Sequence, residues 1–312
     1  MCLIMNKKAV KSNFSLLLAA AIWGLAFVAQ RDSMNYIGPL AFTALRYFLG
    51  AFALIPVCVF TLGSFKKHNG SEKTKKAAKR SLTLGAVCGV VLFGASVSQQ
   101  IGLKYTTAGK AGFITALYIV LVPVMGRIVF KNKTSVNTWV SVVLAAAGLY
   151  LLCVKEGFSI SRGDLWVILC AFIFTVQILL IDRYAEGTDT TLVSMTQFLT
   201  VAVITVPFAL IFEPKITAEQ MSGAWISIAY TGIFSSAVGY TLQIVGQKSA
   251  ENPTIAALLM SMESVFAALS GWLILHETLS GKELIGVALM ACAIVLSQLP
   301  VVEKNKKAKA DN

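Results

Sequence analysis

Ten long apolar segments, separated by short polar stretches, constrain the fold of this chain more than any other feature. A helix needs roughly 20 apolar residues to cross the hydrocarbon core of a bilayer, within a range of about 17–25. The segments that reach or approach this length are 14–30, 40–63, 82–103, 111–130, 136–154, 165–181, 190–212, 223–246, 255–275 and 284–302. Lipid offers the backbone no hydrogen-bond partner, so each segment is expected to be helical. The prediction is an all-α integral membrane protein with ten transmembrane helices.

The composition supports this class and argues against others. Hydrophobic residues make up 56% of the 312 residues and charged residues only 13%, whereas an average soluble domain carries about 25% charged residues. The formal net charge is +12, but the basic residues form short clusters without interleaved aromatic residues, so no nucleic acid is expected as a partner. The six cysteines form no CxxC pair, and we expect neither disulfides nor a metal site.

The distribution of Lys and Arg predicts the orientation, because cytoplasmic loops carry an excess of both. With the N-terminus inside, the cytoplasmic side holds Lys7, Lys8, Lys11, Lys66, Lys67, Lys73, Lys75, Lys76, Lys79, Arg80, Arg127, Lys131, Lys133, Arg183, Lys248, Lys304, Lys306, Lys307 and Lys309. Both termini are therefore expected in the cytoplasm of a bacterial cell. The basic loop 64–81 is expected to contact anionic lipids, and residues 303–312 form a basic tail. The first segment resembles a secretory signal, but nine further segments follow it, which favours a retained helix over a cleaved signal.

An internal repeat appears when the sequence is shifted by 144 residues. The shift aligns Gln99 with Gln243, Gly102 with Gly246, Lys104 with Lys248, Thr134 with Thr278, Val143 with Val287 and Ala147 with Ala291. The predicted repeats are 14–154 and 164–302, each with five spans. Because five is odd, the second repeat must enter the membrane from the opposite side. Such inverted repeats provide alternating access to a site near the middle of the membrane.

Small residues and prolines mark places where the helices are expected to pack closely or bend. Gly85 and Gly89 in the third segment, and Gly232, Gly239 and Gly246 in the eighth, are expected at helix contacts. Pro123 and Pro207 lie inside apolar segments and are expected to kink or loosen them.

Several motifs resemble the EamA-type family of the drug/metabolite transporter superfamily. They are the run from Thr107 to Pro123 (TAGKAGFITALYIVLVP), Ile22-Trp23-Gly24, Arg46, Glu263 and the end of the ninth segment, Leu275-His276-Glu277-Thr278-Leu279. The resemblance covers about residues 14–299 and implies ten helices and solute movement without ATP. Members export or take up amino acids, other metabolites and drugs. Two positions depart from the family pattern: Ser264 replaces a proline that many relatives carry, and Lys131-Asn132-Lys133 replaces an acidic residue.

Two charged residues are the foremost candidates for the path of a solute or ion. Glu263 lies near the centre of the ninth segment, where a charged group costs at least about 2.5 kcal/mol on insertion scales. It should therefore face the interior, either as a proton-coupling carboxylate or as a structural hydrogen-bonding group. Arg46 could neutralise Glu263, hold a carboxylate of the substrate in a bidentate fork, or extend to the outer interface; the last interpretation is favoured.

Further polar and aromatic candidates are less specific. Gln99 and Gln243 are repeat mates, and Gln243 is accompanied by Tyr240; they fit a cavity lining or polar packing between helices equally well. Lys110 is expected to line the outer mouth or to extend toward the interface. Gln177, Tyr118 and Trp23 lie within apolar segments, and core filling is the favoured role for Trp23.

Taken together, these features predict a secondary transporter of small metabolites, amino-acid-like or drug-like, with proton-coupled export as one mode. The chain has no GxxxxGK(S/T), HExxH or GxSxG motif, so neither ATP use, nor an enzyme, nor a cofactor is expected. Small solutes, membrane lipids and a coupling proton are the expected partners. A passive channel and a polytopic membrane enzyme acting on lipid are the alternatives.

Overall fold

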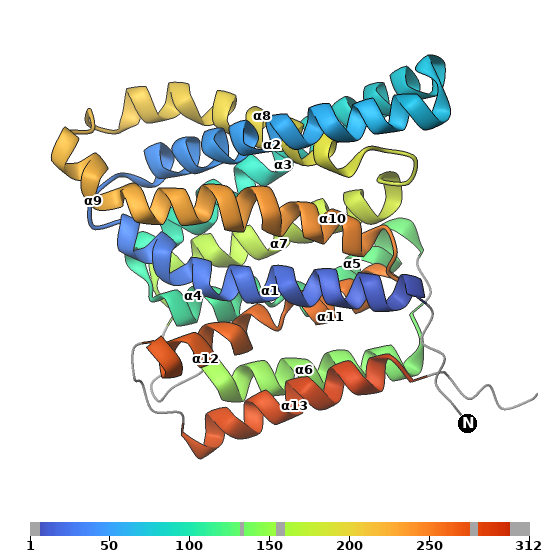
Figure 1. Ribbon diagram of the computed structural model, residues 1–312. Helices are drawn as coiled ribbons and strands as arrows, with labels where there is room; N and C mark the ends of the chain where they lie inside the picture. The colour runs from blue at the N-terminus through green and yellow to red at the C-terminus, as the bar shows by residue number, and fades with distance from the viewer. Residues whose placement is uncertain (1–6, 132–133, 154–159, 275–279, 300–312) are drawn as a thin grey trace, which may run out of the picture.

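The computed structural model describes residues 7–131, 134–153, 160–274 and 280–299, and this part of the chain contains helices and no strands (Figure 1). The helices are α1 (Lys7–Ser33), α2 (Pro39–Asn69), α3 (Ser71–Tyr105), α4 (Ala108–Thr115), α5 (Tyr118–Phe130), α6 (Val136–Cys153), α7 (Arg162–Tyr184), α8 (Thr190–Phe212), α9 (Ala218–Ala229), the π-helix η1 (Tyr230–Tyr240), α10 (Thr241–Gln247), α11 (Pro253–Met260), α12 (Glu263–Ile274) and α13 (Gly281–Ser297). The spans that they form lie side by side, with the connections from one span to the next at the two ends of the bundle (Figure 1).

Nine helical segments in the described residues are long and apolar enough to cross a membrane. Three of them are composite: α4 with α5, α9 with η1 and α10, and α11 with the first part of α12. The expected tenth segment, 284–302, overlaps α13, which at 17 residues is shorter than the other nine. Residues 132–133, 275–279 and 300–312 lie outside the described residues, and with them Lys133, the 275–279 part of the family-like ninth-segment motif, and the basic tail.

The surface of the bundle is apolar, as a lipid environment requires. Large hydrophobic side chains such as Phe52, Phe60, Leu210 and Ile226 are between 65% and 78% exposed. Many polar side chains are instead buried between helices. A water-soluble protein rarely exposes apolar surface on this scale, so the inverted distribution agrees with the membrane class predicted from the sequence.

Glycines allow the closest helix contacts. Helix α6 packs on α13, where a Cβ on Gly148 would lie 2.7 Å from the carbonyl oxygen of Gly286. On α3, Gly85 and Gly89 face α8, with Cβ positions 2.9 Å and 2.8 Å from carbonyl oxygens of that helix. Gly85 and Gly89 therefore lie at a close helix contact, as expected from the sequence.

Two of the apolar segments are broken near their middle. The first breaks at residues 116–117, between α4 and α5, and the second at 261–262, between α11 and α12. Pro123 lies inside α5, several residues after the first break, and Pro207 lies inside the continuous helix α8. The interruption expected at Pro123 therefore lies closer to the N-terminus of the segment, and α8 continues without a break through Pro207.

Candidate functional site

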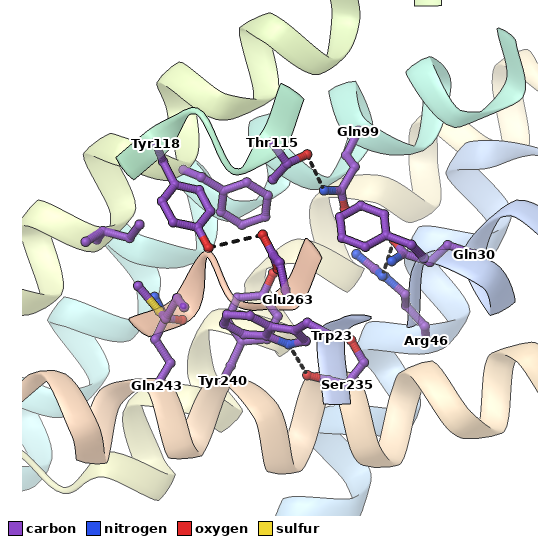
Figure 2. A pocket seen from close by; sticks show the side chains of 14 residues that line it. Trp23, Gln30, Arg46, Gln99, Thr115, Tyr118, Ser235, Tyr240, Gln243 and Glu263 are labelled. Atoms are coloured by element: carbon purple, nitrogen blue, oxygen red, sulfur yellow. Dashed lines mark hydrogen bonds between the residues drawn. The ribbon is translucent and has the colours of Figure 1, made fainter. Parts of the chain in front are cut away.

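A buried pocket lies where the two broken segments meet α1, α2, α3, α7, η1 and α10. Its walls are formed by Trp23, Phe27, Gln30, Arg46, Gln99, Thr115, Tyr118, Phe174, Ile178, Ser235, Tyr240, Gln243, Met260 and Glu263 (Figure 2). Seven of the nine candidates proposed from the sequence are among them. The cavity volume is about 40 Å³, and one water needs roughly 10–15 Å³. The pocket is therefore contracted in this structure and has room for only a few waters.

Glu263 enters the pocket because the break in its segment places it at the first position of α12. Its side chain is 3% exposed and accepts a hydrogen bond of 3.1 Å from the hydroxyl of Tyr118, the first residue of α5 (Figure 2). Gly24 of α1 allows this arrangement, since a Cβ there would lie 2.6 Å from the carbonyl oxygen of Glu263. Three segments that are distant in sequence thus meet at Glu263.

Arg46 lies on α2 and is 2% exposed, so it does not extend to the interface as the favoured sequence interpretation had it. Its Nη1 donates to Oε1 of Gln30 at 2.8 Å, and its Nη2 donates to the hydroxyl of Tyr47 at 3.0 Å. The guanidinium also stacks over the ring of Tyr47, 4.5 Å from its centroid. Among the described residues no carboxylate oxygen lies within 4.0 Å of Arg46, so it does not form an ion pair with Glu263.

An aromatic and hydroxyl cluster forms the wall beside Arg46. The hydroxyl of Tyr47 lies 2.7 Å from Oγ of Ser96 and donates to the hydroxyl of Tyr240 at 3.3 Å. The rings of Trp23 and Tyr240 are 5.0 Å apart, and Nε1 of Trp23 donates to the carbonyl oxygen of Ser235 at 3.0 Å. Trp23 therefore has a polar anchor as well as the core-filling role expected of it.

The glutamines occupy two different depths. Gln99 lines the pocket and donates to Oγ1 of Thr115 at 3.2 Å. Gln243 also lines it and donates to Oε1 of Gln177 at 3.1 Å, whereas Gln177 itself is fully buried behind the wall. Gln177 therefore does not line the pocket; it accepts a hydrogen bond from Gln243, which does.

Lys110 lies away from the pocket, in the first turn of α4. Its Nζ is 2.5 Å from a carboxylate oxygen of Asp164, which is 1% exposed. Asp164 forms a capping box with Ser161 at the start of α7 and accepts a hydrogen bond of 2.7 Å from Thr106. The structure thus places Lys110 in an ion pair that joins the starts of α4 and α7.

Several lining residues were missed in the sequence. Gln30, the partner of Arg46, ends the first apolar segment, and its polarity was a usable signal. Thr115 and Ser235 are small polar residues of a kind that occurs throughout the chain. Phe27, Phe174, Ile178 and Met260 carry no signal, because an apolar side chain in an apolar sequence looks the same whether it faces lipid or a pocket.

A second, larger hollow of about 440 Å³ adjoins the pocket. Phe27 belongs to the lining of both, and the rest of the hollow includes Arg31, Asp32, Thr107 and Glu283. It lies toward the end of the bundle where α1 ends and α4 begins. The described residues contain no group of three or more His, Cys, Asp or Glu side chains that could hold a metal ion.

Comparisons with known proteins agree with a membrane transporter. Residues 10–154 and 161–299 each match the EamA-like transporter family. An uncharacterized transporter of Archaeoglobus fulgidus is 29% identical over 94% of this chain and 88% of its own length, and the transporter YoaV of Bacillus subtilis is 23% identical over 92% and 97%. A chloroplastic WAT1-related protein of Arabidopsis thaliana is 27% identical over 89% of this chain and 67% of its own length.

A protein of known crystal structure shares the fold. It superposes with a TM-score of 0.74, covering 93% of this chain and 96% of the other, at 19% sequence identity. Two family matches that together cover most of the sequence, the apolar outer surface and the relatives named as transporters lead to one conclusion. The chain is a multi-pass membrane protein that belongs to the EamA-like transporter family.

Proposed function

We propose that the protein is a secondary transporter that moves small amino-acid-like or drug-like solutes across the cytoplasmic membrane by alternating access, with protons as the coupling ion for export. The observation that carries this proposal is the pocket itself. It collects a buried Arg and a buried Glu, Arg46 and Glu263, between helices of both halves of the chain. Ionisable groups inside membrane segments are costly and typically mark substrate or ion pathways.

The mechanism rests on an arrangement of ten helices as two inverted repeats, 14–154 and 164–302. Packing between corresponding helices supports it, since α2 packs on α8 and α6 packs on α13. The two breaks support it as well. Thr107 caps α4 and Asn252 caps α11, and these positions differ by 145 residues, as do Tyr118 and Glu263. Discontinuous helices at corresponding positions are typical of transporters that bind solutes at a repeat interface.

The contracted pocket and the adjoining hollow suggest how access would alternate. Phe27 is 3% exposed and separates the two spaces. Rocking of one repeat against the other would widen the pocket toward this hollow in one state and toward the opposite end of the bundle in the other. The positive charge at the start of α1 and in the α2–α3 hairpin, which lie at the same end in Figure 1, supports a cytoplasmic location for that end.

Solute counterflow in proteoliposomes tests the carrier mechanism. A panel of labelled amino acids, organic acids and amines is offered outside vesicles that contain the same solute unlabelled. A carrier exchanges the two, so the unlabelled pool accelerates uptake of the label. A passive channel gives flux without this acceleration, and a lipid-modifying enzyme gives no solute flux; either result would exclude the proposal.

A further inference from the structure

Arg46 is a buried cation without a counter-charge in the described part of the chain. Its two recorded side-chain hydrogen-bond partners, Gln30 and Tyr47, are both neutral. Removing a charged group from water is costly unless an opposite charge or a full set of hydrogen bonds replaces the water. Glu263 does not fulfil this role, since no ion pair joins the two residues and its carboxylate is held by Tyr118.

The guanidinium of Arg46 is nevertheless held in place, and one of its hydrogen-bond donors has no partner among the described residues. Gln30 and the hydroxyl and ring of Tyr47 fix its position from two sides. A guanidinium has five N–H donors, and the Nε donor of Arg46 is buried without a hydrogen-bond partner among the described residues. Arg46 also lines the pocket, beside Gln30 (Figure 2). A fixed guanidinium with a free donor is suited to a carboxylate, whose two oxygens match its geometry.

Resting on the proposed transport function, we infer that the transported solute carries a carboxylate group, which binds Arg46. The remainder of the solute lies against the aromatic wall of Trp23, Phe27 and Tyr240, which suits an apolar body. Bound in this way, the solute supplies the counter-charge that the protein lacks at Arg46. Purely cationic solutes are disfavoured by the same residue.

The inference also relates the solute to the proton. The ionisable side chains that face Glu263 across the pocket are Arg46 on α2, Tyr118 on α5 and Tyr240 on η1, with Cys170 of α7 behind them. With Glu263 protonated and both tyrosines neutral, the pocket has a charge of +1 and attracts a carboxylate. With Glu263 ionised, the pocket is neutral overall and holds the carboxylate less well. Proton and carboxylate therefore favour each other's binding and cross the membrane together, so export of the solute carries protons outward and is driven by the outward gradient of the solute.

The test uses wild-type protein and sets of solutes that share one carbon skeleton but differ in the charged group. Each set contains an acid, its amide and the matching amine, for example 3-phenylpropanoate, 3-phenylpropanamide and 3-phenylpropylamine, and further sets use short straight-chain and amino-acid skeletons. Thermal stabilisation and counterflow are measured for each. We expect the carboxylate member of at least one set to bind at least about tenfold more tightly than its amide, given the strength of charge-assisted hydrogen bonds.

Two outcomes would overturn the inference. If amides or amines bind or exchange as well as their acids, transport stands and the carboxylate site does not. If no carboxylate in any set binds while other solutes are exchanged, Arg46 has a structural role instead. Absence of exchange for every solute would instead contradict the proposed function itself.

Variants of Arg46 test directly whether this residue binds the carboxylate. Arg46→Lys keeps the charge without the fork, and Arg46→Met removes both; Arg183→Gln, an arginine exposed at the end of α7, is the matched control. We expect carboxylate affinity to fall at least about tenfold in Arg46→Met and less in Arg46→Lys, with no change in Arg183→Gln. Equal affinity in all three folded variants would contradict the site.

A second, independent feature is a groove of about 500 Å³ between α3 and α7. The two helices are antiparallel, because Gly102 lies near Gly163 at one end and the groove joins Arg80 to Tyr184 at the other. Lys76, Lys79 and Arg80 line its outer end, and Leu84, Val87 and Leu180 line its deeper, apolar end. Among the described residues no carboxylate lies within 4.0 Å of these three cations.

We propose that this groove binds one anionic phospholipid. Three cations above an apolar floor match a phosphate headgroup with acyl chains that run into the bilayer. The half-exposed Tyr184 also lines the groove, and amphipathic rings such as that of Tyr usually lie at the membrane interface.

Native mass spectrometry after mixing with phosphatidylglycerol and phosphatidylcholine tests this site. We expect retained phosphatidylglycerol in the wild type and in the control Lys66→Gln/Lys67→Gln/Lys73→Gln, and its loss in Lys76→Gln/Lys79→Gln/Arg80→Gln. Equal retention by both triple variants would overturn the proposal. Excess inorganic phosphate should not displace the lipid; displacement by phosphate would show a site for the free anion instead.

Discussion

Glu263 shows how single residues of this chain acquire a role through their surroundings. In sequence it is one acidic residue within an apolar run, and in the structure it is enclosed by α1, α5 and α12. Its carboxyl group has one recorded donor, Tyr118, in a pocket whose other walls combine aromatic and apolar side chains with Arg46 and neutral polar groups. Such a group can exchange a proton only when the pocket opens to water, which is the property that a coupling residue needs.

Replacing Glu263 with Gln is expected to abolish transport driven by a pH gradient while counterflow of the solute continues. The amide retains an oxygen acceptor for Tyr118 but cannot release a proton. Both activities are measured in the same proteoliposomes, with Glu72→Gln, an exposed residue at the start of α3, as the control. Unchanged coupling in Glu263→Gln would exclude the proton role.

Gly24 is expected to tolerate no side chain. A Cβ there would lie 2.6 Å from the carbonyl oxygen of Glu263 and 2.8 Å from the backbone nitrogen of Ala267, so α1 or α12 would have to move. Overpacking of this kind costs about 1–3 kcal/mol. We expect Gly24→Ala to lower the melting temperature and the transport rate, whereas Gly63→Ala, which lies inside α2 where the described residues leave the space open, should lower neither. Equal behaviour of the two variants would contradict the close contact.

At the scale of elements, the breaks in two segments determine the site. Helix α5 begins with Tyr118 and α12 begins with Glu263, so each break delivers one partner of the hydrogen bond that joins the halves. In a continuous helix, the regular helical turn would fix the direction in which each of these side chains points. The π-helix η1 has a comparable effect, because it places Ser235 and Tyr240 together at the wall.

The hydrogen bond between α5 and α12 can be measured by a double-mutant cycle. Tyr118→Phe removes only the hydroxyl, and we expect it to cost about 0.5–1.5 kcal/mol of stability, or up to about 3 if Glu263 is ionised. In Glu263→Leu, which removes the acceptor, the further effect of Tyr118→Phe should become smaller because the contact is already lost. Additive effects on the free energy of unfolding would show that the two residues do not interact.

At the scale of the whole molecule, the inverted arrangement predicts the sides of the membrane on which loops lie. In a variant without native cysteines, a single cysteine at Lys131, which follows α5, should react with membrane-impermeant reagents only from the cytoplasm. A cysteine at Ser280, which precedes α13, should react only from outside. Both positions lie in the loop before the last span of a repeat, so labelling of both from the same side would remove the basis for alternating access.

The sequence was sufficient for the class of the protein and for much of the pocket. Nine of the ten spans predicted from apolar length are long and apolar enough to cross a membrane in the described residues, and seven of nine candidate residues line one cavity. It was insufficient for Lys110, whose partner Asp164 lies in another helix, and for Arg46, which donates a hydrogen bond to Gln30 of another helix. Long-range partners of this kind leave no local pattern in a single chain.

The sequence alone determined that this chain resides in a membrane, because the length and apolarity of its segments are local properties that the bilayer selects directly. The orientation that its basic residues indicate stays a prediction. The tertiary structure decided which faces of the helices meet, where two segments break and which polar groups remain unpaired. In lipid, hydrophobicity does not distinguish an inward face from an outward one, so close packing at glycines such as Gly24 and hydrogen bonds between distant helices must decide the geometry of the site.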